Sequence, residues 1–407
     1  MKFRPEWARS HFPALDRPAV FLDGPAGSQV PRSVIDAISS YYAKHNANHG
    51  GCFRTSRESD AVTDWARRSC ADLLGVADPE CVVFGANMTT LTFAFSRAIA
   101  TEWQPGDEIM VTRLDHDANV SPWVRAAQDR GVTVRHIAIH PEDCTLDQDD
   151  FRRQLSSRTK LVAIGCVSNA VGTRNPVAEM TKIAHEAGAM VFLDAVHHAP
   201  HLAIDAAAWD CDFVCCSAYK FFGPHVGVMY GKREHLERLP AYKVRPCPET
   251  LPDRWMTGTQ NFAAIAGVGA AIEYLSGVGR SVGVTGDRRA MLLGAFEAIE
   301  AYERHLGAHM LAELATLKQV KVHGITDLKR MGERVPTVSF THAKKSPAEV
   351  AEFLGERDIF VWSGNYYALP LTEALGVEPH GMVRVGLLHY NTAAEVNELI
   401  HALRELE

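Results

Sequence analysis

The sequence has few cysteines, no excess of basic residues and no long apolar run. Nine cysteines scattered over 407 residues are too few for a disulfide scaffold. Forty-two basic against forty-nine acidic residues leave a net charge of −7, which gives no electrostatic reason to expect nucleic acid or an anionic membrane as a partner. No apolar run approaches the roughly 18 to 20 residues that span a bilayer.

The first sixteen residues mix charged and apolar side chains and lack the apolar segment of a secretory signal. We therefore expect a cytoplasmic protein. Apolar residues make up 46% of the chain and charged residues 22%, a balance typical of a globular protein, and the length suits two or three domains.

Three of the cysteines, Cys211, Cys215 and Cys216, cluster within one apolar run. No second Cys/His pair stands at ligand spacing, and adjacent residues of a strand point to opposite faces. We therefore predict no metal site and interpret these thiols as small buried hydrophobes. No cysteine follows Cys247, an absence that limits the chemistry available to the last third of the chain.

Short apolar runs alternate with amphipathic helical patterns over the first two-thirds of the chain. Several runs are apolar throughout, as in strands buried on both faces of a sheet. The alternation predicts an α/β fold with a mostly parallel sheet between helices. The predicted strands are 19–22, 81–84, 108–112, 132–139, 160–167, 190–193, 213–217 and 227–230, and the predicted helices between them are 61–74, 89–100, 122–130 and 177–187.

From about residue 276 the pattern changes to long helical stretches, 281–307 and 310–317, with strand-like segments at 337–341 and 382–388. This predicts a smaller α+β domain. We place a large domain at 21–275 and a small one at 276–407, with the N-terminal segment 1–20 packed against the small domain. Ligands of open α/β sheets bind beyond the carboxyl ends of the strands, so chemistry-bearing residues are expected directly after the apolar runs.

Lys220 closes one such run and is followed by two aromatic residues and a Gly-Pro turn. An ammonium group there is partly desolvated, which favours the neutral amine that a Schiff base requires.

Asp194 ends another apolar run, about one βαβ step earlier in a parallel sheet. A buried carboxylate needs a cationic partner. An aspartate facing a pyridinium nitrogen, with a lysine bonded to the aldehyde, is the recurring protein contribution in pyridoxal 5'-phosphate (PLP) enzymes. Taken singly, a solvent-reaching lysine and a helix-capping aspartate are the alternatives.

Polar residues follow other predicted strands as well. Residues 82–90 form a strand, a glycine turn and a helix start, an arrangement whose free N–H groups suit a phosphate. Ser217 and Thr259 could each add a hydroxyl. His116 follows the third run and could stack on an aromatic ring or move protons. Asn169 follows the fifth run and could donate to a phenolic oxygen.

Together these segments resemble the class V aminotransferase family of fold-type I PLP enzymes, and within it the cysteine desulfurase-like proteins. The resemblance runs from about Phe21 to the C-terminal helix and is most specific around Lys220, at Asp194 with His197, at 115–119 and at Arg384. It implies PLP as the cofactor and a seven-stranded, mostly parallel sheet in the large domain.

The resemblance also implies roles for the matched residues. Lys220 would hold the cofactor, Asp194 would pair with its pyridinium nitrogen, and His116 would stack on its ring. Arg384 would bind the substrate carboxylate with two parallel hydrogen bonds. The other implied cofactor contacts are Asn169 and His197 at the ring hydroxyl and, at the phosphate, Asn87, Met88, Ser217 and a Thr259 from the neighbouring subunit of a homodimer, whose loop 49–53 would reach the same site.

The sequence departs from the resemblance at the nucleophile. Cysteine desulfurases carry a reactive cysteine on a loop a few residues before a proline, and in the corresponding loop, 361–370, the matching residue is Tyr367. A phenol cannot accept sulfur as a persulfide. We expect Tyr367 and Asn365 to contact substrate, with Trp362 and Tyr366 completing an aromatic wall; packing between domains is the alternative role of that wall. Cys52 is the candidate for a relocated nucleophile.

We therefore expect an enzyme that binds a small L-α-amino acid as an external aldimine, with Lys220 as the base that forms a Cα carbanion. Cleavage of a bond from Cβ to a leaving group, as in desulfurase-like lyases but without a persulfide cysteine, is the expected outcome. Transamination, racemisation and β-decarboxylation on the same scaffold are alternatives. A retired scaffold for sulfur trafficking is the non-enzymatic alternative, and the intact Lys220, Asp194 and Arg384 argue against it.

Overall fold

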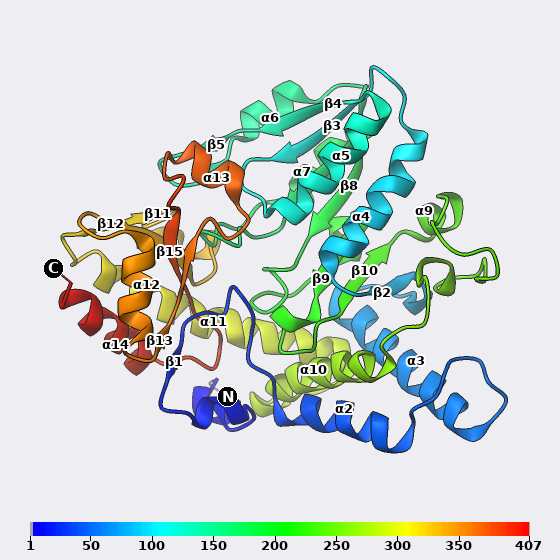
Figure 1. Ribbon diagram of the computed structural model, residues 1–407, viewed down its shortest axis with the longest axis horizontal. Helices are drawn as coiled ribbons and strands as arrows, with labels where there is room; N and C mark the ends of the chain where they lie inside the picture. Colours follow the sequence, from blue (N-terminus) through cyan, green and yellow to red (C-terminus); the bar gives the residue numbers. More distant parts are fainter. Residues whose placement is uncertain (1–2, 407) are drawn as a thin grey trace.

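A seven-stranded sheet forms the centre of the larger part of the molecule in the computed structural model, which describes residues 3–406 (Figure 1). Its strand order is β2 (Val82–Gly85), β10 (Gly227–Gly231), β9 (Phe213–Ser217), β8 (Met190–Asp194), β7 (Thr159–Gly165), β3 (Glu108–Thr112) and β4 (Thr133–Ile137). From β9 to β4 the neighbours are parallel, and β10 is antiparallel to both β2 and β9. The sequence-based prediction of a mostly parallel seven-stranded sheet is confirmed.

Helices pack around this sheet. In Figure 1, α4 (Met88–Ile99) and α5 (Ser121–Arg130) lie against the strands, and α2 (Arg32–Lys44), α3 (Arg54–Leu74), α10 (Phe262–Ser281) and α11 (Arg288–Leu314) gather beneath them. The remaining elements of this part are α6 (Gln148–Gln154), α7 (Val177–Glu186), α8 (Ala206–Trp209), α9 (Arg233–Arg238), β5 (Ile139–His140) and β6 (Thr145–Leu146).

Helix α10 corrects one expectation. By length and hydropathy it is the one helix within residues 3–406 that could cross a membrane, although no such run was expected from the sequence. Within its apolar window 83% is buried inside the protein, where it packs against α2, α3 and α11. At Gly269 a Cβ atom would stand 2.3 Å from the Trp65 ring, so the helices meet at close range. Burial among other helices accounts for its all-round apolar character.

The smaller part contains a four-stranded antiparallel sheet in the order β11 (Val320–His323), β12 (Thr337–His342), β15 (Met382–Gly386) and β14 (Trp362–Gly364). Helices α12 (Pro347–Gly355) and α14 (Ala393–Arg404) contribute apolar side chains to the core of this part, and α13 (Leu369–Ala374) follows β14. Strand β1 (Val20–Phe21) pairs in parallel with β13 (Ile359–Phe360), so the beginning of the chain is joined to the smaller part.

The two parts share structure where the sequence suggests a boundary. Residue 275 lies inside α10. Helix α11 serves both cores: Leu292 and Phe296 belong to the core of the large part, and Leu306 and Met310 belong to that of the small part. The segment after α1 (Pro5–Arg9) lies between the two parts, because the Phe12 ring contacts rings from both of them.

Candidate active site

A pocket of about 580 Å³ opens at the carboxyl ends of β7, β8 and β9. Its volume suits a small organic molecule. Eight of the nine cofactor residues predicted from the sequence line it. The lining residues are Asn87, Met88, Thr89, Thr90, Asp115, His116, Ala118, Gly165, Val167, Asn169, Asp194, Val196, His197, Ser217, Tyr219, Lys220 and His225.

Lys220 stands at the end of a short 3-10 turn directly after β9, and its side chain is buried. Its amine donates to the backbone carbonyl of Ala26 at 3.1 Å and to that of Pro25. Burial and, to a smaller extent, the charge of Arg384 lower the pKa of this amine to about 7, against the opposing charges of Asp194 and Asp23. Near neutral pH much of the amine is therefore uncharged, which is the form that adds to an aldehyde.

Asp194 is the last residue of β8 and is also buried. One carboxylate oxygen accepts a hydrogen bond from the backbone N–H of Val196 at 2.8 Å. Burial raises the pKa of this carboxyl to about 6 in spite of that hydrogen bond and the charge of Lys220, which both act to lower it. A cationic ring nitrogen would supply the partner that a buried carboxylate needs.

We predict that Asp194→Asn stabilises the cofactor-free protein at pH 8 and leaves its stability unchanged at pH 4. The folded-state pKa of about 6 lies above the usual value near 4, so the cost of ionising Asp194 in the folded protein builds up between about pH 4 and pH 6 and is fully present at pH 8. Removing that cost corresponds to about 2 to 3 kcal/mol, or a rise of roughly 3 °C in Tm. Thermal unfolding at the two pH values measures it, and a lower Tm for the variant at pH 8 would contradict the prediction.

The residues of the pocket fit PLP. Two buried atoms, Asn169 Oδ1 and His197 Nδ1, have no hydrogen-bond partner within residues 3–406. The opposite ends of both side chains are anchored, because Asn169 Nδ2 donates to the Tyr366 carbonyl at 3.0 Å and His197 Nε2 lies 2.8 Å from Thr337 Oγ1. Burial holds the pKa of His197 well below its usual value, so the imidazole is neutral. A phenolic hydroxyl, which both donates and accepts, would satisfy the two unpaired atoms.

His116 is held as a flat neutral ring at one wall of the pocket. Its Nδ1 accepts from the Ala118 N–H at 3.0 Å and so caps the short turn that follows β3. Burial lowers its pKa to about 4, and the charges of Lys220 and Arg384 act in the same direction. The Tyr367 ring lies 5.4 Å away at an angle of 34°. The imidazole is therefore neutral and is held through its Nδ1 atom, which leaves the face of the ring available to stack on a planar ligand.

The N-terminus of α4 lies at the other end of the pocket. Asn87 caps this helix by accepting from the Thr90 N–H at 2.9 Å, and Ser217 Oγ accepts from the Met88 N–H at the same distance. A Cβ atom on Gly227 would stand 2.5 Å from the Asn87 carbonyl carbon, so only glycine lets β10 begin this close to the helix. The exposed N–H groups and dipole of a helix start favour a phosphate at this end.

Arg384 lies in the middle of β15 and is buried. Its Nη1 donates to the Asn169 carbonyl at 2.9 Å, and its guanidinium stacks over the Tyr366 ring at 4.3 Å. No carboxylate within residues 3–406 forms an ion pair with it. Burial lowers its pKa to about 10, so it keeps its charge at neutral pH. Arg384 does not itself line the pocket, but it touches Asn169, which does.

The loop carrying Tyr367 and Asn365 is fixed above His116 rather than lining the pocket. The Tyr367 carbonyl accepts from the Asp117 N–H at 2.6 Å, and its side chain is 72% exposed. Both Tyr366 and Tyr367 have positive φ angles, near 55° and 59°. Asn365 uses its amide within the loop: its Oδ1 accepts from the Tyr367 N–H, and its Nδ2 donates to Glu378. Substrate contact by these two residues stays a prediction.

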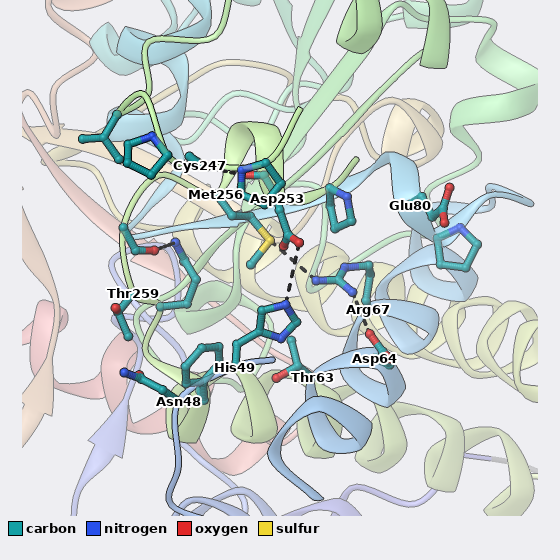
Figure 2. A pocket seen from close by; sticks show the side chains of 18 of the residues that line it. Asn48, His49, Thr63, Asp64, Arg67, Glu80, Cys247, Asp253, Met256 and Thr259 are labelled. Atoms are coloured by element: carbon teal, nitrogen blue, oxygen red, sulfur yellow. Dashed lines mark hydrogen bonds and ion pairs between the residues drawn. The ribbon is translucent and has the colours of Figure 1, made fainter. Parts of the chain in front are cut away.

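Thr259 and His49 lie in a second cavity, of about 690 Å³, which shares no lining residue with the first (Figure 2). It is walled by α3 and by the segment that precedes α10. Arg67 reaches into it between Asp64 and the Met256 thioether. Within one chain, therefore, Thr259 does not reach the Lys220 pocket, and its predicted phosphate contact stays a prediction.

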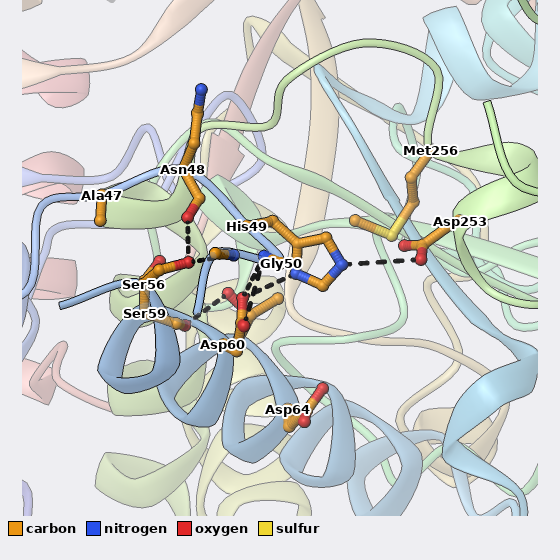
Figure 3. A network of polar contacts seen from close by, with 12 residues as sticks. Ala47, Asn48, His49, Gly50, Ser56, Ser59, Asp60, Asp64, Asp253 and Met256 are labelled. Carbon is orange, nitrogen blue, oxygen red and sulfur yellow. Dashed lines mark hydrogen bonds and ion pairs between the residues drawn. The ribbon is translucent and has the colours of Figure 1, made fainter. Parts of the chain in front are cut away.

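The 49–53 loop is held at the start of α3 by a network of polar contacts (Figure 3). His49 Nδ1 lies 2.7 Å from Asp60, and its Nε2 lies 3.7 Å from Asp253. Ser56 Oγ accepts from the Gly51 N–H and donates to the Asn48 carbonyl. The loop ends on Cys52 and Phe53, which are both exposed.

His225 was not predicted from the sequence, yet it lines the pocket and stacks on Tyr219 with the ring planes 10° apart. It lies in the turn between two antiparallel strands, five residues after Lys220. The sequence signal that could have identified His225 is its position as a polar residue in the loop that follows a reactive lysine.

Proteins of known type are similar to the chain over nearly its whole length. The sequence model of the aminotransferase class-V family matches residues 20–399. A cysteine desulfurase from Dickeya dadantii (strain 3937) is 31% identical over 418 residues, covering 98% of this chain and 95% of that protein. A cysteine desulfurase from Enterobacter sp. (strain 638) is 32% identical over 431 residues, covering 100% and 99%. The apo structure of a cysteine desulfurase from Thermococcus onnurineus NA1 matches with a TM-score of 0.88 at 27% identity, covering 100% of this chain and 98% of that one.

With its fold and this pocket, the chain belongs to the aminotransferase class-V family and is a PLP-dependent enzyme. The predicted family, fold class and cofactor are confirmed. Within the family it is of the cysteine desulfurase-like type.

Proposed function

We propose that this enzyme is a lyase that acts on a small L-α-amino acid and breaks a bond between Cβ and a leaving group. The observation that carries the proposal is the position of Lys220, whose buried amine has a pKa of about 7 and shares one pocket with the buried carboxylate of Asp194. A lysine base and an acid for the ring nitrogen are the two protein groups that carbanion chemistry on PLP requires.

When bound, PLP supplies an electron sink for negative charge at the substrate Cα. The side chains of the protein bind the substrate and transfer its protons. Arg384 binds the substrate carboxylate, and the Lys220 amine takes the proton from Cα. Asp194 would keep the ring nitrogen protonated. His116 would stack on the ring and, as a neutral imidazole, can accept a proton during the reaction.

The fate of the leaving group follows from the thiols. All nine cysteines lie within residues 3–406, and none lines the pocket. Seven are buried, and burial raises their pKa, so they are poor nucleophiles. Cys52 is exposed and Cys247 is half-buried, but both lie outside the Lys220 pocket of their own chain. We therefore infer that a sulfur leaving group departs into solvent and is not stored as a persulfide.

The products from cysteine test this inference. Elimination with release to solvent turns cysteine into pyruvate, ammonia and sulfide in equal amounts, whereas transfer to an enzyme thiol yields alanine and a persulfide. We expect pyruvate and sulfide as the products of wild type, Cys52→Ala and Cys247→Ala alike. Cys247→Ala should also retain at least about half of the wild-type rate, since surface substitutions away from a site have small effects. Product analysis and thiol labelling of the enzyme measure this. Alanine as the main product, lost in Cys52→Ala, would contradict the proposal.

Transamination is the second candidate, because it uses the same lysine, aspartate and arginine and also needs no enzyme thiol. It differs in requiring an α-keto acid as amino-group acceptor. Incubating the holoenzyme with a panel of amino acids, with and without a keto acid, separates the two reactions: a product that forms only with the keto acid supports transamination.

We also propose that the working unit is a homodimer. Thr259 and the 49–53 loop lie in a cavity apart from the Lys220 pocket of their own chain, which supports their service to the site of a second copy. A cytoplasmic location likewise stays a prediction.

A further inference from the structure

A stacked pair of rings, Tyr219 and His225, forms part of the pocket wall beside Lys220. The ring centroids are 4.9 Å apart and the planes lie within 10° of parallel. Tyr219 precedes Lys220 in the turn after β9, and His225 precedes β10. His225 is exposed and Tyr219 is partly buried, and both line the pocket.

The backbone around His225 is tied to the phosphate end of the pocket. The Ala218 N–H donates to the Val226 carbonyl at 2.8 Å, which joins the two turns that carry the stacked rings. Two residues after His225, Gly227 pairs with Ser217 on one side and with Gly85 on the other. Gly227 also passes close to Asn87 at the start of α4. His225 is therefore a near neighbour of the helix start that favours a phosphate.

Two of the donors at that end of the pocket are already engaged. The Met88 N–H is taken by Ser217 Oγ, and the Thr90 N–H by Asn87 Oδ1. Lys220 is the one lysine or arginine among the lining residues, and its amine is required at the aldehyde. A phosphate carries close to two negative charges near pH 7 and accepts several hydrogen bonds. A further side-chain donor would add to the hydrogen bonds available to such a group, and His225 lines the same pocket.

We propose that His225 is a ligand of the cofactor phosphate, with its imidazole N–H donating to a phosphate oxygen and its ring held in position by stacking on Tyr219. The proposal rests on PLP binding in the Lys220 pocket. It adds a cofactor-binding residue to those implied by the family resemblance and gives the Tyr219 ring a structural role.

The test compares two variants and two ligands. His225→Ala removes both the donor and the stacked ring, and His225→Phe keeps a stacked ring without a donor. Each is titrated with PLP and with pyridoxal, which has the same aldehyde and ring but no phosphate. Visible absorbance of the protein-bound aldehyde reports binding, and ³¹P NMR of the bound cofactor reports the phosphate environment. His140→Phe, at an exposed histidine of β5, is the matched control.

We expect both His225 variants to bind PLP about ten- to a hundredfold more weakly, the loss expected for one hydrogen bond to a charged group. Pyridoxal binding should be unchanged, and the ³¹P signal should move in both variants. Normal PLP binding in His225→Phe would overturn the proposal, because stacking alone would then account for the residue. Equal weakening with both ligands would also overturn it. A wild-type protein that binds neither ligand would instead contradict the proposed role of Lys220.

Discussion

Lys220→Ala will abolish the visible absorbance of the bound cofactor and lower the rate by at least about a thousandfold. The substitution removes the amine that bonds to the aldehyde and the base that takes the Cα proton, and a positioned base alone contributes about a hundred- to ten-thousandfold. The measurements are the absorbance spectrum of purified protein with added PLP and the steady-state rate with the best amino acid of the panel.

Lys160→Ala is the matched control, since Lys160 lies on the surface at the start of β7 and pairs with Asp107 at 3.6 Å. It should keep both the colour and the rate. A Lys220→Ala protein with the wild-type spectrum, or a wild-type protein that stays colourless with PLP, would contradict the assignment of Lys220 and with it the proposed chemistry.

Arg384→Met will raise KM for the amino-acid substrate about a hundredfold or more and will not lower the Tm of the cofactor-free protein. Loss of a buried, hydrogen-bonded charge partner costs several kcal/mol in binding. In the free protein, however, the Arg384 guanidinium is buried with one hydrogen bond and one ring contact but no carboxylate partner, so its desolvation is only partly compensated. A methionine of similar shape removes that cost.

Arg334 provides the control for this experiment. It is as deeply buried as Arg384, and burial lowers its pKa to about 10 as well. Its guanidinium is saturated, however, by the carbonyls of Val171, Thr337 and Ile325. Arg334→Met should therefore lower the Tm by leaving buried carbonyls unpaired. If Arg384→Met destabilises as strongly as Arg334→Met while KM is unchanged, Arg384 is a structural residue.

The parts of the site predicted from sequence are those on consecutive parallel strands. Asp194 and Ser217 each end a strand, and Lys220 follows within one turn. Because parallel strands end at one edge of the sheet, their terminal residues meet without any knowledge of the loops. The mostly parallel sheet was predictable for the same reason, since most of its strands are short apolar runs, whereas the number of seven strands came from the family resemblance.

The parts that could not be predicted depend on contacts between distant segments. The stacking of His225 on Tyr219 depends on how two turns meet, and the anchoring of Tyr367 depends on how the small part docks on Asp117. Some helix boundaries were predicted wrongly. The periodicity predicted two helices, 281–307 and 310–317, where one helix begins at Arg288 because Asp287 caps it by accepting from the Ala290 N–H.

Helix α11 also constrains how this enzyme can diverge. Because its first half completes one apolar core and its second half completes the other, neither part of the chain is a separable module. A recombination event that exchanges the C-terminal third with a related gene must either cut this helix or import it with a foreign packing surface. New substrate preferences in this scaffold should therefore arise by point substitution in the loops around the pocket and not by shuffling whole domains.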